Sequence, residues 1–339
     1  MAEGEGFEPP DPLRGQVISS HPPSSTRPPL RKKIMALGKE KSQGKLDMKI
    51  EPGLFSRSTL GGDVNKMDIV IFRVAAVFYL ASASLYVYYL FRTRERVSKR
   101  AYLLLMIAFM IHTLALVSRA FVARHLPATN LFESLSLFSW MVAGGYLLLE
   151  WRYKIPILGS FVAPLNFLGV LIATLNPQTV RPLPPALKST WLYIHATTSF
   201  LGEVAFALAF VVSSVYLIQE RYIRKKRLGG LFQKLPSLGQ LDELNYRLLT
   251  LGFPFLTLGI ITGAIWAQYA WGAYWSWDPK ETWSLITWFI YAAILHGRMT
   301  VGWRGRRAAI LSVVGFGAVL FTFLGVNLLL PGLHSYSSM

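Results

Sequence analysis

The sequence predicts an all-α polytopic membrane protein with about eight transmembrane helices and an outward-facing, tryptophan-rich loop. Three observations support this class. Apolar stretches of about 20 residues recur along the chain. Charged residues make up only 16% of it, against ~25% in an average soluble domain. Lys and Arg gather between the apolar stretches.

Net charge and cysteine content narrow the function further. The charge of +17 is distributed as the topology of a membrane protein requires, so we expect contacts with membrane lipids and no nucleic-acid partner. The chain has no cysteine, which excludes structural disulfides, thiolate zinc sites, iron–sulfur ligation and cysteine nucleophiles.

The segment 1–66 differs in composition from the rest of the chain. It is rich in Pro, Gly, Ser and Lys, contains 11 Lys and Arg, and lacks a long apolar run. We therefore expect 1–66 to form a disordered basic tail and 67–339 to form the membrane domain. Met35, Met48 and Met67 are alternative starts, which favours an over-long start or a dispensable extension.

Eight apolar segments follow this tail. At ~1.5 Å per residue, each covers most of a ~30 Å hydrocarbon core. They lie at 68–91, 101–123, 132–150, 156–175, 190–219, 248–268, 282–297 and 308–330. The seventh is the shortest, and we expect it to extend backwards into the loop before it. Prolines inside the spans are tolerated because neighbouring helices satisfy the freed carbonyls.

Alternate loops differ in charge, which sets the orientation. The loops 92–100, 151–155, 220–247 and 298–307 contain 18 Lys and Arg. The opposite loops contain five: Arg119, Arg124, Arg181, Lys188 and Lys280. The more basic side is cytoplasmic, so the loop at 269–281 and both ends of the membrane domain are predicted to face outward.

The segment 269–283 concentrates aromatic rings. It contains Trp271, Trp275, Trp277 and Trp283, four of the ten tryptophans of the chain. An interfacial anchor needs only one or two rings at a helix end, so this density favours a shelf for a large, flat, conjugated ligand. Haem meets that description, because its porphyrin face stacks on indoles while its propionates and iron need polar partners.

Two histidines fall at the level of this loop. The topology places His195 near the outward end of the fifth span and His334 just after the outward end of the eighth. Two neutral imidazoles beside an aromatic shelf are the axial ligands that six-coordinate haem iron uses. His296 is about 15 residues, or ~22 Å, from the outward start of the seventh span, near the cytoplasmic leaflet.

Four motifs carry a family resemblance. The segment 271–283 reads W-G-A-Y-W-S-W-D-P-K-E-T-W, and the segment 126–140 reads L-P-A-T-N-L-F-E-S-L-S-L-F-S-W. W-L-Y-I-H ends at His195, and G-L-H-S-Y surrounds His334. In these motifs the chain closely resembles the CcsA/ResC type of cytochrome c biogenesis protein, the haem-handling subunit of the cytochrome c synthetase, whose signature is the tryptophan-rich WWD motif.

The resemblance implies that haem b is held at the outward face. The axial ligands would be His195 and His334, above the WWD shelf. His296 would belong to a second, transmembrane haem site whose other histidine comes from a ResB-like partner subunit. The remaining residues implied to bind the cofactor are Trp271, Gly272, Tyr274, Trp275, Trp277 and Asp278.

The resemblance also implies a function in cytochrome c maturation. Haem would be delivered across the membrane and presented at the outward site, where the thiols of an apocytochrome c C-x-x-C-H segment add to the haem vinyls. The chain would belong to a holocytochrome c synthase complex, and no catalytic residue beyond the haem site is predicted. The implied location is the bacterial plasma (inner) membrane, with the WWD loop and the C-terminus on the extracytoplasmic side.

Two other functions remain as alternatives. A related WWD protein that passes haem to a chaperone would typically have about six spans or be much longer. A b-type cytochrome that carries electrons would place histidine pairs on two facing helices, whereas His195 and His334 lie at outer helix ends.

Polar residues outside the histidine set are first assigned structural roles. Asp278 before Pro279 is typical of a helix N-terminus, and Glu281 is expected to hold the same loop. His112 is interpreted as a hydrogen-bonded packing residue inside the membrane, and His125 as a surface residue.

The sequence allows more than one role for each of two acidic residues. Glu203, eight residues inward of His195, is expected to pair with a neighbouring polar group, with proton relay or contact with a haem propionate as the alternative. Glu133 is expected either to position a loop or to line the haem pocket.

Overall fold

The structure, a computed structural model, contains helices and no strand among the residues it describes, which are 57–92, 94–180, 183, 188–226, 229 and 232–330, with side chains from Met67 onward. The helices are α2 (Arg57–Phe91), α3 (Glu95–Ala123), α4 (Leu131–Tyr153), α5 (Gly159–Thr174), α6 (Thr190–Arg224), α7 (Leu238–Trp271), α8 (Pro279–Thr300), α9 (Arg306–Leu320) and α10 (Val326–Leu329). Short helices η2 (Pro156–Leu158) and η4 (Phe232–Lys234) precede α5 and α7, and a π-helical turn, η5 (Phe321–Gly325), joins α9 to α10.

Each apolar segment of the sequence forms a helix, and the prediction of a polytopic all-α protein is confirmed. Among the described residues, seven helices are long and apolar enough to cross a membrane. The seventh predicted span, α8, is not one of them. Its 22 residues would cover ~33 Å, but it begins with Pro-Lys-Glu and ends near Arg298, which lowers its hydropathy. It nevertheless packs against α7 and α9.

Local signals fix where the helices begin and end. Asn130 accepts a hydrogen bond from the backbone N–H of Glu133 and starts α4. Ser237 and Gln240 form a capping box at the start of α7. Gly272 ends α7 with φ +79°, a left-handed conformation that glycine adopts without steric cost. This glycine therefore determines where the tryptophan-rich loop leaves the helix.

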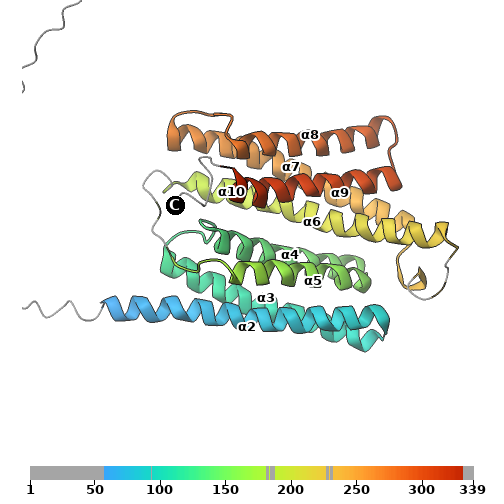
Figure 1. Ribbon diagram of the computed structural model, residues 1–339, viewed down its shortest axis with the longest axis horizontal. Helices are drawn as coiled ribbons and strands as arrows, with labels where there is room; N and C mark the ends of the chain where they lie inside the picture. Colours follow the sequence, from blue (N-terminus) through green and yellow to red (C-terminus); the bar gives the residue numbers. More distant parts are fainter. Residues whose placement is uncertain are drawn as a thin grey trace, which may run out of the picture. The chain divides into compact units, whose positions relative to one another are not determined.

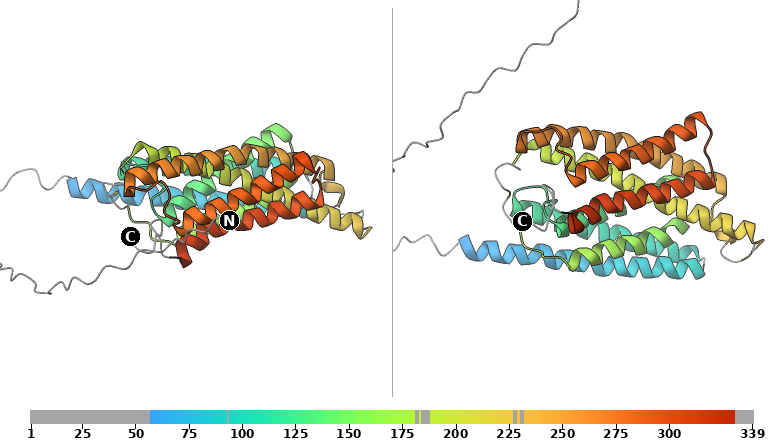
Figure 2. Two further views of the ribbon diagram at one scale, coloured as in Figure 1. Left: turned by 90° about the horizontal axis from the view of Figure 1, so that it is seen from above. Right: turned by 45° about the horizontal axis from the view of Figure 1, so that its top comes forward.

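The helices form two groups that meet at α4 and α6. In one group α2 packs on α3 and α5, and α4 packs on α5; in the other, α6 packs on α7 and α9, and α8 packs on α9. Figure 1 shows the blue-to-green group beside the yellow-to-red group, and the right view of Figure 2 shows the same division. Gly145 of α4 allows the groups to approach closely, because an added Cβ would lie 3.1 Å from Val204 of α6.

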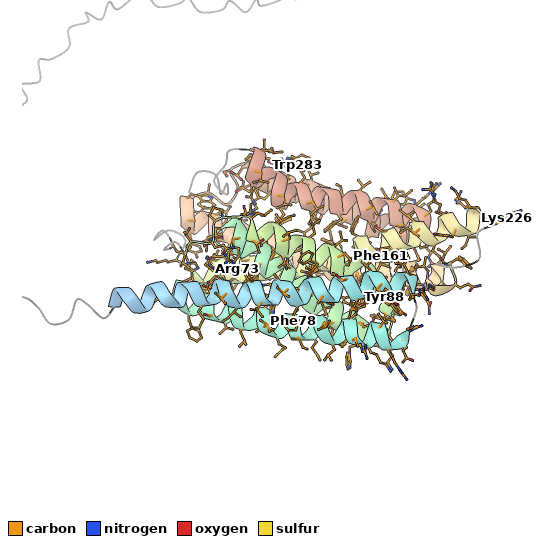
Figure 3. All side chains as sticks on the ribbon, turned by 60° about the horizontal axis from the view of Figure 1, so that its bottom comes forward. Arg73, Phe78, Tyr88, Phe161, Lys226 and Trp283 are labelled. Carbon is orange, nitrogen blue, oxygen red and sulfur yellow. The ribbon has the colours of Figure 1, made fainter. Side chains whose placement is uncertain are left out.

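The two ends of the bundle differ in chemistry. Trp283, near the start of α8, and Lys226, after the end of α6, mark opposite ends in Figure 3. The tryptophan-rich loop lies between the end of α7 and the start of α8. We call this the loop end, and we call the opposite end, where α6 terminates in Arg221 and Arg224, the basic end.

A buried ion triad joins three helices near the loop end. Arg119 of α3 donates to Asp68 Oδ2 of α2 and to Glu133 Oε1 of α4, each at 2.9 Å. Glu133 also accepts from the backbone N–H and the hydroxyl of Thr129, at 3.0 and 2.7 Å. The three charged side chains are at most 3% exposed. The assignment of Arg119 to a loop was therefore wrong, and Glu133 has the loop-positioning role.

Two histidines outside the proposed haem set are buried. His112 is hydrogen-bonded through Nε2 to Ser136 Oγ at 2.8 Å and through Nδ1 to Tyr79 Oη at 3.3 Å, which confirms the packing role. His125 is also buried, and its Nδ1 donates to the backbone oxygen of Leu126 at 3.0 Å. The prediction that His125 is a surface residue was wrong, because the loop before α4 turns inward.

Candidate functional site

A cavity of about 410 Å³ lies near the loop end. Its walls come from α4, α6, α7, α8, α9 and η5, together with the loop before α4, Leu183 before α6, and the tryptophan-rich loop. This volume is within the range of ~300–1,000 Å³ typical of small-molecule sites. The lining is mostly apolar, with a small number of polar side chains.

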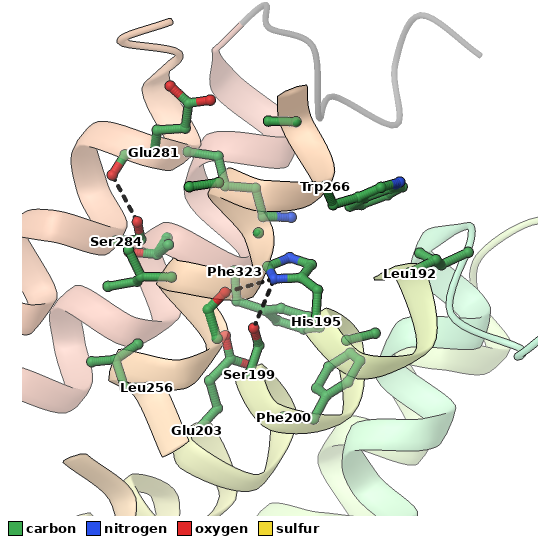
Figure 4. A pocket seen from close by; sticks show the side chains of 18 of the residues that line it. Leu192, His195, Ser199, Phe200, Glu203, Leu256, Trp266, Glu281, Ser284 and Phe323 are labelled. Atoms are coloured by element: carbon green, nitrogen blue, oxygen red, sulfur yellow. Dashed lines mark hydrogen bonds between the residues drawn. The ribbon is translucent and has the colours of Figure 1, made fainter. Parts of the chain in front are cut away.

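His195 of α6 lines this cavity. Its Nδ1 lies 2.8 Å from the carbonyl oxygen of Gly259 on α7, and 3.5 Å from Ser199 Oγ one turn along α6. Figure 4 shows both contacts, with Trp266 on the other side of the ring. Because a carbonyl oxygen can only accept, Nδ1 carries the proton, and the lone pair of the neutral imidazole is on Nε2. A metal-ligating histidine is oriented in this way.

Glycines of α7 make room for this ring. A Cβ added at Gly263 would lie 2.8 Å from both Cε1 and Nδ1 of His195. A Cβ at Gly259 would lie 2.6 Å from Ser199 Oγ. The spacing of four residues places both glycines on one face of α7. A larger residue at either position would therefore displace the imidazole or force α6 and α7 apart.

Aromatic rings surround the imidazole. The ring centroids of His195 and Trp266 are 5.8 Å apart, and those of Trp266 and Trp271 are 6.0 Å apart. Trp266 is only 6% exposed, and its indole N–H has no acceptor among the residues that the structure describes. An acceptor atom of a bound molecule or a water would satisfy this donor.

The structure divides the residues of the tryptophan-rich loop into two sets. Trp271, Tyr274 and Trp275 line the cavity. Trp277 is 69% exposed and is not a lining residue, with its ring centroid 5.9 Å from that of Trp275 in an edge-on arrangement. Gly272 and Asp278 do not line the described cavity either, so their effect on a ligand there would be indirect.

The backbone of this loop is strained at Trp277. Its φ of +58° places a bulky residue in the left-handed region, at a cost of roughly 1–2 kcal/mol. Strained residues of this kind cluster at functional sites, where the surrounding structure holds them. Here the strain accompanies a sharp turn that exposes the indole just before α8 begins.

Asp278 and Glu281 hold the loop in place. Asp278 Oδ1 accepts from the backbone N–H of Lys280 at 3.0 Å, and Glu281 Oε2 accepts from the N–H groups of Asp278 and Ser276 at 3.2 and 2.8 Å. With Pro279 at the first helical position, these acids form the capping box that begins α8. The structural role predicted for both acids is confirmed.

His296, another predicted iron ligand, does not line the described cavity. His334 falls outside the described residues. His296 is exposed on α8, and by helical rise it is ~18 Å beyond Ser284, a cavity residue of the same helix. The prediction of a separate second site at His296 thus stays a prediction.

Sequence reasoning missed part of the cavity lining. Lys280 and Trp266 line it, and neither was singled out as a ligand contact. Glu203, for which contact with a haem propionate was the alternative interpretation, lines it as well. The spacing of His195, Ser199 and Glu203, four residues apart in α6, was the available signal, because it places all three on one helix face.

The segment 128–334 matches the family model described as "Cytochrome C assembly protein". The chain belongs to this family. The matched region begins just before α4 and includes all of the described cavity lining. Its function therefore lies in cytochrome c biogenesis, and the resemblance seen in the sequence is confirmed.

Curated relatives named cytochrome c biogenesis protein CcsA agree with this membership. The protein of Synechococcus sp. (strain CC9605) is 38% identical over 259 residues, which cover 69% of this chain and 85% of the relative. That of Gloeobacter violaceus is 40% identical over 283 residues, covering 68% and 84%. That of Chlamydomonas reinhardtii is 43% identical over 219 residues, covering 62% of this chain but only 61% of the algal protein.

The helical arrangement is also similar to a solved structure. The cytochrome c haem lyase CcmF superimposes with a TM-score of 0.56 at 20% sequence identity, over 77% of this chain and 47% of that chain. At this level of identity the likeness concerns the fold alone.

Proposed function

We propose that the cavity is a haem site for cytochrome c maturation and that His195 is an axial ligand to the iron. The observation that carries the proposal is the orientation of this side chain. Nδ1–H donates a hydrogen bond to the carbonyl oxygen of Gly259 at 2.8 Å, so Nε2, beside the Trp266 indole, has the lone pair that a metal would bind.

The other residues that line the cavity fit the porphyrin of a haem. Trp271, Tyr274 and Trp275 offer aromatic surface to a porphyrin face. We propose His334 as the second axial ligand from its place in the sequence. Two imidazole ligands would keep the iron low-spin until the histidine of the C-x-x-C-H segment replaces one of them.

The reaction itself needs little from the chain besides positioning. Each cysteine thiol of apocytochrome c adds across a haem vinyl group, so that sulfur bonds to one vinyl carbon and hydrogen to the other. Holding the vinyl group and the thiol together lowers the activation barrier by several kcal/mol, and by up to ~7–11 kcal/mol in well-oriented cases. The chain supplies the haem, and the thiols come from the acceptor.

The proposal includes a partner subunit. His296 is exposed on α8, which is not among the seven described helices that are long and apolar enough to cross a membrane. An exposed imidazole on a membrane helix calls for a partner group. We propose that a ResB-like subunit covers this side of α8 and supplies the second ligand of a lower haem site, with haem passing to the outward site for attachment.

The test is replacement of His195 by Gly in protein purified with a ResB-like partner. We expect wild-type protein to show a low-spin bis-histidine spectrum, the His195→Gly variant to lose the outward haem, and added imidazole to restore it. Restoration by imidazole distinguishes a lost ligand from a misfolded chain. An unchanged spectrum in His195→Gly would contradict the assignment.

A second readout separates the alternative functions. Co-expression with a C-x-x-C-H reporter, in a host without its own maturation system, should give covalent haem on the reporter. Haem that remains bound to the chain without covalent transfer would favour an electron-carrying cytochrome. Non-covalent transfer to an acceptor protein would favour delivery to a chaperone.

A further inference from the structure

Three charged side chains line the cavity and are not used by the proposed iron ligation: Lys280, Glu203 and Glu281. The carboxylate of Glu281 accepts hydrogen bonds from the backbone N–H groups of Ser276 and Asp278, which leaves Lys280 and Glu203 for consideration. Glu203 lies on α6 and Lys280 lies in the first turn of α8, and both line the cavity. Burial and the charge of Lys280 both act on the Glu203 carboxyl, burial more strongly. Hydroxyl groups complete this polar part of the lining: Ser199, Ser284, Thr287 and Thr322.

Glu203 is placed deeper than the imidazole. It follows His195 by eight residues, which corresponds to ~12 Å along α6. Figure 4 shows Glu203 below Ser199, on the side of His195 away from Trp266. A charge inside a membrane domain is costly unless an opposite charge compensates it. Lys280 is a cation that lines the same cavity as Glu203.

We propose that this polar part of the cavity is a subsite for a carboxylate of the ligand, with Lys280 as its cation and Glu203 as the counter-ion that Lys280 faces when the site is empty. The inference rests on the proposed haem function, since the carboxylate is then a haem propionate. An ammonium that meets a second carboxylate in a cavity of low polarity forms a charge-assisted hydrogen bond.

The subsite gives the haem a direction. The two propionates of haem b occupy one side of the macrocycle, and the two vinyl groups lie away from them. A propionate held at Lys280 places the propionate edge beside the first turn of α8. The vinyl edge then points away from α8, toward Leu192 of α6, which lies across the cavity from Glu281 and Ser284 in Figure 4. The thiols of an incoming C-x-x-C-H segment would reach it there.

Glu203 and the propionate compete for one ammonium. Removing the charge of Glu203 while keeping its shape, as in Glu203→Gln, therefore strengthens binding of a haem that has free propionates. A Glu203 that only supported the fold would do the opposite, since its replacement would weaken every ligand alike. The sign of this effect separates the two roles.

The experiment compares three probes on haem-depleted protein prepared with its partner. Haemin has both propionates and vinyls, its dimethyl ester has neutral ester groups in place of the propionates, and mesohaemin has ethyl groups in place of the vinyls. We expect Lys280→Gln to weaken haemin and mesohaemin ~10–100-fold, the range of a lost charge-assisted hydrogen bond. Affinity for the ester should not change.

Three further variants complete the design. Glu203→Gln should bind haemin and mesohaemin several-fold more tightly than wild type and the ester equally well. Lys280→Arg, which keeps the charge, should retain most of the haemin affinity. Lys225→Gln, an exposed residue at the basic end, should behave as wild type.

Each result has a definite meaning. Selective weakening of haemin and mesohaemin in Lys280→Gln, with tighter binding in Glu203→Gln, would support the subsite. Equal weakening of haemin and ester in Lys280→Gln, or weaker haemin binding in Glu203→Gln, would overturn the carboxylate subsite and leave the haem site standing. Wild-type protein that binds none of the three probes would overturn the haem function and the subsite together.

Discussion

Replacement of Gly263 by Ala is the sharpest test of how His195 is held. The added Cβ would lie 2.8 Å from two atoms of the imidazole, well inside van der Waals contact. The ring would have to turn or move, and the 2.8 Å hydrogen bond to Gly259 would lengthen. The contact lies on the ring itself, and α7 remains a helix.

The expected energies separate stability from ligand binding. Overpacking of this kind costs about 1–3 kcal/mol, and the gain in helix propensity from Gly to Ala returns about 1 kcal/mol. The net loss of unfolding free energy is thus about 0–2 kcal/mol. Disturbing the group that orients a metal ligand costs ~10–100-fold in affinity. We therefore expect protein that folds nearly normally but binds haem poorly.

The assay is haem affinity and spin state of purified Gly263→Ala protein, with thermal unfolding measured on the same sample. Gly317→Ala is the matched control, because Gly317 lies in α9 and its added Cβ would meet no atom within 4 Å. The control should keep its haem and gain up to about 1 kcal/mol. Wild-type affinity and spectrum in Gly263→Ala would refute the position assigned to His195.

Two further predictions concern stability and orientation. Arg119→Met should lower the free energy of unfolding by about 3–5 kcal/mol, because it leaves two buried carboxylates uncompensated. The control is Lys99→Met, which removes an ion pair with Glu95 whose side chains are 73% and 78% exposed. It should change the free energy of unfolding by less than about 1 kcal/mol. Thermal unfolding checks both, and similar shifts would contradict the triad's role. Because the natural chain has no cysteine, Ser276→Cys should react with an impermeant thiol reagent from outside and Val301→Cys only after lysis; the reverse pattern would invert the topology.

Helix positions and the start of α8 could be predicted because their causes are local. Apolar stretches of about 20 residues form helices wherever they enter a membrane. The capping box at the start of α8 could be predicted because Asp278, Pro279 and Glu281 lie within four consecutive residues, and the structure contains this capping box. The level of His195 relative to the tryptophan-rich loop follows from counting spans, and both line one cavity.

Features that depend on a neighbouring helix could not be predicted. Nothing near Arg119 in the sequence indicates that Asp68, far earlier in the chain, lies 2.9 Å away. The burial of His125 depends in the same way on how a loop packs. For Glu203, the sequence shows an acid in an apolar helix, and pairing with a neighbour is then the ordinary expectation. The structure places this acid in the lining of a cavity that also contains Lys280 of α8, which the spacing along α6 could not indicate.

The ion triad explains how one wall of the cavity is formed before a ligand arrives. Thr129 lines the cavity and donates two hydrogen bonds to Glu133, which Arg119 holds in turn. Glu133 lies within the region that matches the family, whereas Arg119 and Asp68 precede it. The helices α2 and α3 therefore contribute to the site without lining it: they fix the loop before α4 and reduce the ordering that binding would otherwise require.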